Sequence, residues 1–381
     1  MADPLADRWD VAVVGAGVAG AVAALRLARR DLKVLLVDKA DWPRDKVCGG
    51  CVNTAALHAL AAAGLADIAA IGQPYAEMQL AAGGVQARFP LPAGRAVSRR
   101  QLDAKLVDAA IAAGVEFRPA TNVALGKANA DGRLIELRCG DERTIVNAKL
   151  VLACDGLKSR LLERVLQPVR RAPASRIGAG ALLDNAPAAY APGIIHMACA
   201  EHGYVGLVRV DDNRLNIGAA LEPAWVKGIG GPAAAIGNIL AAAGLPPLPG
   251  LVEAHWRGTP HLTRSHDLLG AERLLALGDA AGYVEPFTGE GMAWAVAGAA
   301  AVEPFALAAV ADWRDSLAWA WTAEHRRLIH NRQRACRGVA SLLRRPRAVQ
   351  SAIRLAAAAP IVAAPLTAWL NRDFQATTGK Q

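Results

Sequence analysis

Short apolar runs that end in glycine or an acid recur along the chain, and such runs predict buried strands. Residues 10–14 (DVAVV) form the first run, and the segment LKVLLVD, which ends at Asp38, forms the second. The intervening AVAALRLARR is rich in strong helix formers. A strand, a helix and a second strand within about 30 residues predict a β-α-β unit with parallel strands.

The pattern of polar and apolar positions changes in two later regions. Residues 75–95 and about 173–264 carry short alternating runs with scattered turns, which predict antiparallel strands. Within the second region, residues 202–221 (HGYVGLVRVDDNRLNIGAAL) predict a hairpin that turns at Asp211-Asp212-Asn213. From about residue 312 onward the pattern is helical.

Three glycines follow the first predicted strand at the spacing of a dinucleotide-binding fingerprint. Gly15 allows a tight turn, Gly17 lets a pyrophosphate approach the backbone at a helix N-terminus, and Gly20 lets helix and strand pack closely. Asp38 ends the second strand, where a carboxylate accepts hydrogen bonds from ribose hydroxyls. This unit predicts a site for an ADP-containing cofactor, and it does not separate FAD from NAD.

Two later strand ends carry pairs of aspartate and glycine. In AKLVLACDGLKSR, residues 148–160, a predicted buried strand runs into Asp155-Gly156. In RLLALGDAAGYVEPFTGEGM, residues 273–292, another runs into Gly278-Asp279, and a glycine-rich loop and a small-residue helix follow. Each pair taken alone is equally consistent with an ordinary strand-to-turn junction.

Together and in this order, these motifs resemble the flavoprotein hydroxylase superfamily, with the p-hydroxybenzoate-hydroxylase-like fold, over roughly residues 8–310. The resemblance implies FAD as the cofactor, with Asp279 near the flavin ribityl chain and phosphates. A helix that begins near Glu290 would point its positive end at the flavin pyrimidine, where negative charge collects on reduction. The shared FAD and nicotinamide element at Asp155 departs from the family pattern, because Leu162 stands where an arginine is usual.

The resemblance implies a set of cofactor-binding residues, which come from every motif described above and below: Gly15, Ala16, Gly17, Gly20, Asp38, Lys39, Arg44, Cys48, Gly49, Arg99, Val123, Asp155, Gly156, Gly278, Asp279, Pro286, Gly289, Gly291 and Met292. Arg99 lies in VSRRQLDAKLVDAA, which is similar to the family's Arg-x-x-Leu-Asp helix start and places this arginine at the flavin phosphates or ribityl chain. Val123 ends VEFRPATNV, which resembles the strand whose end contacts adenine. A solvated basic helix end remains the alternative for Arg99.

Cys48 and Cys51 are separated only by two glycines. A structural zinc site needs a second such pair, and the other four cysteines are isolated, so no metal site is predicted. A redox disulfide and a thiol that only packs both stay open. PRDKVCGG looks like a segment of the geranylgeranyl-reductase-like branch, whose Cys-Gly-Gly loop lies beside the isoalloxazine. That resemblance implies Cys48 as a candidate catalytic residue facing the flavin, with Arg44 near the cofactor.

Composition and charge narrow the class of protein. The chain has 381 residues, of which 53% are apolar, which is enough for a large core. Its six scattered cysteines fit a reducing compartment, and the N-terminal MADPLADRWD lacks the basic region of a signal peptide, so a cytoplasmic protein is expected.

The net charge of +9 comes from one segment. Between His325 and Arg354 there are nine arginines and no acid, and the rest of the chain has as many basic as acidic residues. This distribution argues against a nucleic-acid-binding surface. A solvated helix face is one interpretation; a dock for an acidic carrier protein, a CoA or pyrophosphate head, or an anionic membrane surface is the other. The basic positions near helical spacing are Arg326, His330, Arg334, Arg337 and Arg344.

We therefore predict an α/β fold with a discontinuous Rossmann-type FAD domain, an antiparallel-sheet substrate domain and a helical C-terminal segment. The predicted FAD domain comprises 1–74, 97–170 and 265–311, with its strands in a parallel sheet. The substrate domain comprises 75–96 and 171–264, and the helical segment 312–381.

The predicted function is an FAD-dependent oxidoreductase, namely a monooxygenase that hydroxylates a bulky apolar, polyketide-like or aromatic substrate. NADPH or NADH would be the transient reductant. The alternative is a geranylgeranyl-reductase-like enzyme acting on carbon-carbon double bonds, which the Cys-Gly-Gly loop favours and the missing Trp-x-Phe-Pro motif at YVGLVRV disfavours. A flavin-binding partner protein without turnover is the third hypothesis. His202 and Tyr204, from the strand above the flavin, are the candidate general bases.

Overall fold

The computed structural model describes residues 7–159, 161–165, 169–285 and 287–359. The predicted β-α-β unit is confirmed: β1 (Arg8–Val14) leads through α1 (Val18–Ala28) to β2 (Val34–Val37), and the two strands pair in parallel. All four residues of β2 are buried. The unit forms because both strands are continuously apolar and α1 is rich in alanine, which lets the helix lie close to the sheet.

The first sheet has the strand order β17-β18-β9-β1-β2-β6, and the five strands from β18 to β6 run parallel. The carboxyl ends of β1, β2 and β9 therefore meet at one edge, where ligands bind in open parallel sheets. A hairpin of β7 and β8 adds antiparallel strands beyond β9. The remaining strands of this sheet are β6 (Glu116–Arg118), β7 (Asn122–Asn129), β8 (Gly132–Cys139), β9 (Glu142–Ala153), β17 (Gly270–Ala271) and β18 (Leu274–Ala276).

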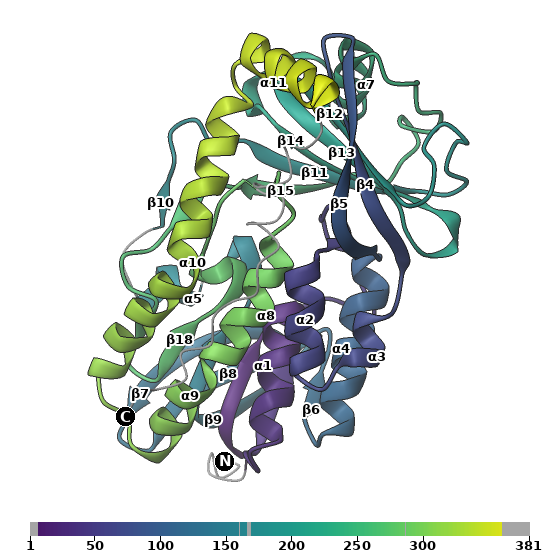
Figure 1. The fold of residues 1–381 in the computed structure, drawn as a ribbon. Coiled ribbons are helices and arrows are strands. Elements are labelled where there is room, and N and C mark those ends of the chain that lie inside the picture. The colour runs from purple at the N-terminus through teal and green to yellow at the C-terminus, as the bar shows by residue number, and fades with distance from the viewer. Residues whose placement is uncertain (1–6, 160, 166–168, 286, 360–381) are drawn as a thin grey trace.

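Helices from distant parts of the chain cover this sheet (Figure 1). Helix α1 packs against both α4 and α8, and α2 also packs against α8. The continuous segment Gly291–Ala311 is long and apolar enough to cross a membrane by length and composition, but 61% of its most apolar window is buried inside the fold. The helices of this region are α2 (Thr54–Ala62), α3 (Ala66–Ala69), α4 (Arg99–Ala112), α5 (Leu161–Val165), α8 (Gly291–Ala301) and α9 (Glu303–Ala311).

The second sheet is largely antiparallel, with the strand order β15-β11-β14-β13-β12-β4-β5-β3. The predicted hairpin is confirmed, since β13 and β14 pair antiparallel on either side of the turn at Asp211–Asn213. Together the two sheets and the C-terminal helices confirm the predicted fold class. The strands are β3 (Cys51–Val52), β4 (Gln73–Ala82), β5 (Val85–Ala96), β11 (Ile177–Leu183), β12 (Ile194–Ala200), β13 (Gly203–Arg209), β14 (Leu215–Leu221) and β15 (Arg257–His261).

The two faces of the second sheet have different neighbours. Helix α7 (Pro232–Ala243) packs on one face through a cluster that includes Ile236 and Leu240. The other face contributes Tyr75, Met197 and Tyr204 to a separate apolar cluster, which also includes residues of the C-terminal helices. Short elements complete the fold: α6 (Pro223–Gly228), β10 (Arg170–Arg171), β16 (Arg264–Ser265) and β19 (Gly282–Tyr283).

One predicted strand is shorter than expected. The segment 115–123 does not form a single strand ending at Val123, because β6 ends at Arg118 and Val123 is the second residue of β7. Pro119 has no backbone N–H to continue the ladder, and Ala120 has a φ of +49°, which turns the chain.

The described part of the C-terminal segment, up to residue 359, is mainly helical, as predicted, and residues 360–381 lie outside the described residues. Helix α10 (Ser316–Leu342) runs along one side of the molecule from the first sheet toward the second, where α11 (Pro346–Ala358) follows (Figure 1). Trp321 of α10 is fully buried, and its indole Nε1 donates to the carbonyl of Ala276 at the end of β18. The C-terminal helix is thus anchored at the same sheet edge as the predicted cofactor site.

His325, one turn after Trp321, makes the stability of the fold dependent on pH. It is buried against the Trp321 ring, and burial, with a smaller contribution from Arg326, lowers its pKa from 6.5 to about 4. Between these values the unfolded chain binds a proton that the folded chain does not, so stability falls as pH falls from 6.5 toward 4. In wild type this effect lowers the free energy of unfolding by up to about 3 kcal/mol between the two pH values, and we expect His325→Phe to remove this decrease.

Chemical denaturation of the wild type and the variant at pH 7 and pH 4.5 measures the difference. His330→Phe is the matched control, since His330 lies on the exposed face of the same helix. An equal pH dependence in wild type and His325→Phe would contradict the assignment.

Candidate functional site

A large cavity of about 1420 Å³ lies between the carboxyl edge of the first sheet and the second sheet. Ligand pockets for drug-sized molecules measure roughly 300–1,000 Å³, so this cavity has room for a dinucleotide together with a second molecule. Its wall contains most of the predicted cofactor-binding residues: Gly15, Gly17, Asp38, Lys39, Arg44, Cys48, Gly49, Arg99, Val123, Asp155, Gly156, Gly278, Asp279, Gly289, Gly291 and Met292. Ala16 and Gly20 lie just behind that wall, and Pro286 lies outside the described residues.

The turn after β1 depends on the absence of side chains. Gly15 has a φ of +106°, and a Cβ there would lie 2.3 Å from the carbonyl oxygen of Cys154. A Cβ at Gly20 would lie 1.9 Å from the carbonyl oxygen of Gly15. These two glycines let α1 begin directly behind the end of β1, with its N-terminal N–H groups facing the cavity.

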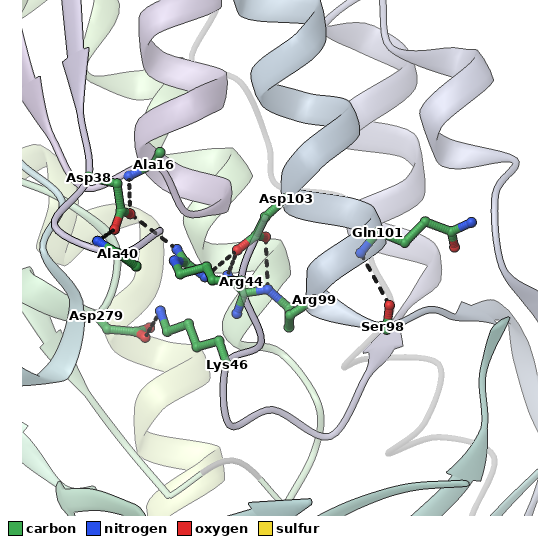
Figure 2. Close-up of polar contacts among 10 residues, drawn as sticks. All are labelled: Ala16, Asp38, Ala40, Arg44, Lys46, Ser98, Arg99, Gln101, Asp103 and Asp279. Carbon is green, nitrogen blue, oxygen red and sulfur yellow. Dashed lines mark hydrogen bonds and ion pairs between the residues drawn. The ribbon is translucent and has the colours of Figure 1, made fainter. Parts of the chain in front are cut away.

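Asp38, at the end of β2, is held by the backbone of its surroundings. Its two carboxylate oxygens accept from the N–H groups of Ala16 at 2.9 Å and Ala40 at 3.0 Å (Figure 2). The Arg44 guanidinium lies 3.4 Å from one of these oxygens. Each carboxylate oxygen has lone pairs beyond these bonds, so Asp38 remains able to accept from a ribose hydroxyl.

Three cationic side chains converge over Gly17, the N-cap of α1. A Cβ at Gly17 would lie 3.4 Å from Arg99 Nη2, 3.6 Å from Arg44 Nη2 and 4.0 Å from Lys46 Nζ. Arg44 and Lys46 come from the loop after β2, whereas Arg99 opens α4 behind its Ser98 N-cap (Figure 2). Three positive charges at a helix N-terminus form a site for a diphosphate.

Asp103 holds two of these cations in place. Arg99 donates from Nε and Nη2 to its two oxygens at 2.9 and 2.7 Å, and Arg44 Nη1 donates at 3.0 Å. The Asp103 carboxylate is 1% exposed. Burial alone would lower the pKa of Arg99, but the charge and hydrogen bonds of Asp103, together with contributions from Cys48 and Asp279, raise the pKa by more in sum, so Arg99 stays charged.

The two later strand ends approach the same place. Gly156 follows β9 with a φ of +76°, and Lys46 Nζ lies 3.5 Å from a Cβ built there. Asp279 follows β18, and its Oδ2 lies 3.4 Å from Lys46 Nζ (Figure 2). Lys46 therefore links the fingerprint loop to both of these segments, a position that no sequence motif assigned to it. Leu162, where the family has an arginine, is fully buried.

The glycine-rich loop before α8 is tied to α10. Glu290, the N-cap of α8, is fully buried, and its Oε1 accepts from Arg332 Nη1 at 2.5 Å. Burial raises the pKa of Glu290 above its usual value, although Arg332 acts in the opposite direction. Thr288 and Cys336 are in hydrogen-bonding contact at 3.1 Å. Arg332 thus offsets the carboxylate at the helix end, which leaves the positive end of α8 directed at the cavity.

The Cys-Gly-Gly loop lies where the part of the cavity lined by the first sheet meets the part lined by the second sheet. The carbonyl of Cys48 accepts from Asn216 Nδ2 of β14 at 2.9 Å, and a Cβ at Gly218 would lie 3.1 Å from Gly49 Cα. Cys51 Sγ donates to the carbonyl of Gly49 at 3.4 Å, and burial raises the pKa of its thiol. Both Cys48 and Cys51 line the cavity at the junction of the sheets, and Cys51 also makes this local bond.

Beyond this loop the cavity becomes apolar. We call this part the chamber. Its wall comes mainly from β4, β5, β12, β13, α10 and α11, together with the residues that follow β15 and α10, and it includes Met78, Phe89, Leu91, Ile195, Met197, Val208, Leu262, Leu343, Val349 and Ala356. Tyr204 of β13 lines the chamber, and its buried hydroxyl has no hydrogen-bond partner among the described residues. Burial raises the pKa of Tyr204 well above 10, so the hydroxyl stays protonated.

His202, the other predicted base, lies elsewhere. Its ring stacks on Trp225 and its Nδ1 lies 2.8 Å from Glu222, with 38% of the side chain exposed. It does not line the cavity. Within the described part of the chain, no group of three or more histidine, cysteine or acidic residues is placed to hold a metal ion.

Some residues of the site were missed by motif analysis. Lys46 lies in PRDKVCGG and Asp103 in VSRRQLDAKLVDAA. The opposite charges of Arg99 and Asp103, four residues apart on one helix, were a usable signal for Asp103. Asn216 and Gly218 were not detectable, because their contacts with the Cys-Gly-Gly loop join segments about 170 residues apart.

The chain matches the family model described as the FAD binding domain over residues 8–202. The chain belongs to this FAD-binding family. FAD is therefore the dinucleotide for which the cavity is built.

Among relatives, the menaquinone reductase of Mycolicibacterium smegmatis is 32% identical over 160 residues, which span 40% of this chain and 39% of that relative. The chain also matches the digeranylgeranylglycerophospholipid reductase of Sulfolobus acidocaldarius at 50% identity over 50 residues, 13% of this chain and 11% of the relative.

Solved structures of FAD enzymes share the fold. The P. aeruginosa protein PqsL, in complex with 2-aminobenzoylacetate, superimposes with a TM-score of 0.69 at 18% identity over 91% of this chain and 99% of PqsL. The myxobacterial chondrochloren halogenase CndH gives a TM-score of 0.74 at 18% identity over 86% of this chain and 81% of that chain. The fold is therefore that of FAD-dependent monooxygenases and halogenases, whereas the matches to the reductases cover about two fifths or less of their length.

The residues of the cavity fit FAD. Gly17 leaves open the space between three cations where a side chain would stand, and the FAD diphosphate carries the complementary charge. Arg44, Lys46 and Arg99 would hold the phosphates, Asp38 a ribose, and the loop of Cys48, Gly49 and Gly289–Met292 the ring system. When bound, FAD supplies the electron-transfer chemistry, and the protein supplies binding, orientation and exclusion of water.

Proposed function

We propose that this flavoprotein is an oxidoreductase that hydroxylates a bulky apolar substrate, with NADPH or NADH as the reductant. The observation that carries the proposal is the continuity of one cavity from the FAD-binding loops into the apolar chamber. The overall reaction converts substrate C–H, O₂, NAD(P)H and a proton into C–OH, water and NAD(P)⁺. The apolar wall of the chamber suits a lipophilic aromatic or polyketide-like substrate that is removed from water before reaction.

The chain's own residues provide orientation within the chamber. Tyr204 is the chamber residue with a buried, unpartnered hydroxyl, and leaving such a group unpaired costs free energy. The hydroxyl is shielded from the empty chamber, so a substrate oxygen would accept from it only after a small rotation of the side chain. Such a bond recovers that cost and orients the substrate relative to the flavin site. Beneath the Tyr204 ring, the buried pair of Arg176 and Glu285 at 2.8 Å supports its position, with the guanidinium 5.7 Å from the ring centre.

A second function, reduction of carbon-carbon double bonds, is favoured by a specific observation. Cys48 lines the cavity near the cofactor loops, and in this second function its thiol would be the proton donor. The matched relatives named as reductases point in the same direction. The overall reaction would convert C=C, NAD(P)H and a proton into the saturated product and NAD(P)⁺, without O₂.

Oxygen dependence distinguishes the two. The purified FAD-loaded protein is supplied with NADPH or NADH and, separately, a long-chain alkylphenol or a geranylgeranyl-bearing lipid. We expect NAD(P)H oxidation to be stimulated by the alkylphenol and its product to gain one oxygen atom from ¹⁸O₂. A geranylgeranyl product two mass units heavier per double bond, formed without O₂, would instead establish the reductase. If neither compound stimulates NAD(P)H oxidation or is converted, both enzymatic proposals lose their support in favour of a flavin-binding partner protein.

Tyr204→Phe tests the polar anchor of the chamber. We expect kcat/KM for the converted substrate to fall roughly tenfold, the value of one hydrogen bond. The thermal midpoint should stay equal or rise, because the buried hydroxyl has no partner to lose. Substrate titration and thermal unfolding measure the two effects.

The matched control is Tyr190→Phe. The Tyr190 hydroxyl donates to the carbonyl of Pro246 in the apolar cluster on the opposite face of the second sheet. We expect this variant to lose stability and keep its turnover. Unchanged kcat/KM in Tyr204→Phe would show that substrate does not use the Tyr204 hydroxyl.

A further inference from the structure

We propose that α11 and the α10–α11 junction form a docking surface for anionic lipid membranes, through which apolar substrate enters the chamber. The proposal rests on the proposed function in one respect, namely that the chamber accepts an apolar substrate. It names where that substrate comes from and which face of the protein meets it.

The chamber wall reaches solvent at this junction. Leu342 at the end of α10 and Leu355 in α11 both line the cavity, yet they are 42% and 54% exposed. Their neighbours Leu343 and Val349 line the same cavity and are buried. Large exposed apolar side chains are therefore continuous with the interior of the chamber, which marks an opening suited to an apolar molecule.

The segment that carries this opening also carries exposed arginines. Five of the nine arginines between His325 and Arg354 are exposed, and their side chains make no hydrogen bond or ion pair within the described ranges: Arg334, Arg337, Arg345, Arg347 and Arg354. The other four hold protein contacts; for example, Arg326 donates to the carbonyl of Asp267 and Arg344 to that of Ala174. No acidic residue lies in this segment. Exposed cations whose side chains have no partner provide charge complementarity to an anionic surface.

Helix α11 has the character of an interfacial helix. Val349 and Ile353 are its buried side, whereas Arg347 and Arg354 are seven residues apart and share an exposed side next to Leu355. Basic residues beside exposed leucine on a helix of this kind place the apolar side chain among lipid tails and the arginines among headgroups. In Figure 1, α11 lies across the end of the second sheet, at the far end of α10 from the first sheet.

An acidic carrier protein would also satisfy the charges, but the membrane accounts for both features. A substrate tethered to a soluble carrier needs cations around the entrance, and it does not require exposed leucines in the wall itself. A lipophilic substrate dissolved in a bilayer needs both, because the entrance must displace headgroups and contact acyl chains.

Vesicle binding tests the proposal without a known substrate. The full-length FAD-loaded protein is sedimented with vesicles of phosphatidylglycerol and phosphatidylcholine, or of phosphatidylcholine alone. We expect binding to the anionic vesicles only, weakening as salt rises. The variant Arg345→Gln/Arg347→Gln/Arg354→Gln should bind on the order of 100-fold more weakly, because each arginine near an anionic surface contributes about a fivefold factor.

The control removes the same charge elsewhere. Arg88, Arg170 and Arg314 are 58%, 71% and 75% exposed, each paired with an acid on the surface. We expect Arg88→Gln/Arg170→Gln/Arg314→Gln to bind vesicles within about threefold of wild type, since paired surface charges contribute little net attraction. Equal losses in both triple variants would indicate a net-charge effect and overturn the proposal. The proposal would also be overturned if the wild-type protein did not bind anionic vesicles, including the case in which it binds an acidic acyl carrier protein instead.

The outcome is separable from that of the proposed function. Vesicle binding requires neither turnover nor a reductant, and FAD content measured on the same samples reports whether each variant is folded and loaded. Conversion of detergent-dispersed alkylphenol tests the enzymatic function without a membrane. A protein that converts the dispersed substrate but binds no vesicle would retain the function and lose the docking surface.

Discussion

Gly17→Val is expected to weaken FAD binding by at least roughly 100-fold while leaving the fold intact. Gly17 has ordinary extended dihedral angles, with φ −79° and ψ −175°, so a β-branched residue is accommodated by the backbone. The new methyl groups would occupy the space between Arg44, Lys46 and Arg99, where the FAD diphosphate must lie. Since a hydrogen bond to a charged group contributes about 1.5–3 kcal/mol, loss of two or more weakens binding by at least roughly 100-fold.

Fluorescence titration of the FAD-free protein with FAD measures this effect. Gly298→Ala is the control, because a Cβ at Gly298 in α8 meets no atom within 4 Å among the described residues and this glycine does not line the cavity. It should bind FAD like wild type. Normal FAD affinity in Gly17→Val would show that the diphosphate does not lie over the start of α1.

Asp103→Ala is expected to destabilise the FAD-free protein by about 3–5 kcal/mol, the usual cost of leaving a buried charge without its partner. The carboxylate accepts both hydrogen bonds of Arg99 and one of Arg44, and it is almost fully buried. Added FAD should recover part of this loss, because its phosphates can pair with the arginines that the substitution leaves uncompensated. The stabilisation by FAD should therefore be larger in the variant than in wild type.

Thermal unfolding with and without FAD measures both effects. Asp108→Ala is the control, since Asp108 lies on the exposed side of the same helix. It should change stability by less than about 0.5 kcal/mol. If the deficit of Asp103→Ala were the same with and without FAD, Arg44 and Arg99 would not be phosphate ligands.

The hydrophobic pattern predicted the first sheet well because its strands are buried on both sides and therefore continuously apolar. The β-α-β unit, the strand before Asp155 and the strand before Gly278 all follow this rule, and each matches a strand of the structure. The prediction failed at residues 115–123, where Pro119 and the positive φ of Ala120 divide one expected strand into two. A local break of this kind leaves little trace in hydrophobic periodicity.

The site was partly predictable for a related reason. Glycines that must avoid a clash, such as Gly15 and Gly20, are visible in sequence because only one residue type fits. Candidate bases were less visible: Tyr204 and His202 are two residues apart, yet one lines the chamber and the other lies on the surface beside Trp225. Sequence alone assigned both to the cavity, because it does not show where the strand begins.

The sequence by itself determined that this chain builds a parallel sheet with a dinucleotide loop, since burial pattern and obligatory glycines are local properties of the chain. Only the tertiary structure decided that Lys46 joins three strand ends, that Asp103 holds two cations and that Arg332 offsets Glu290. It also decided that the chamber opens beside the basic face of α11. These features depend on contacts between segments remote in the chain, and the free energy of such contacts is set by burial and distance rather than by neighbouring residues.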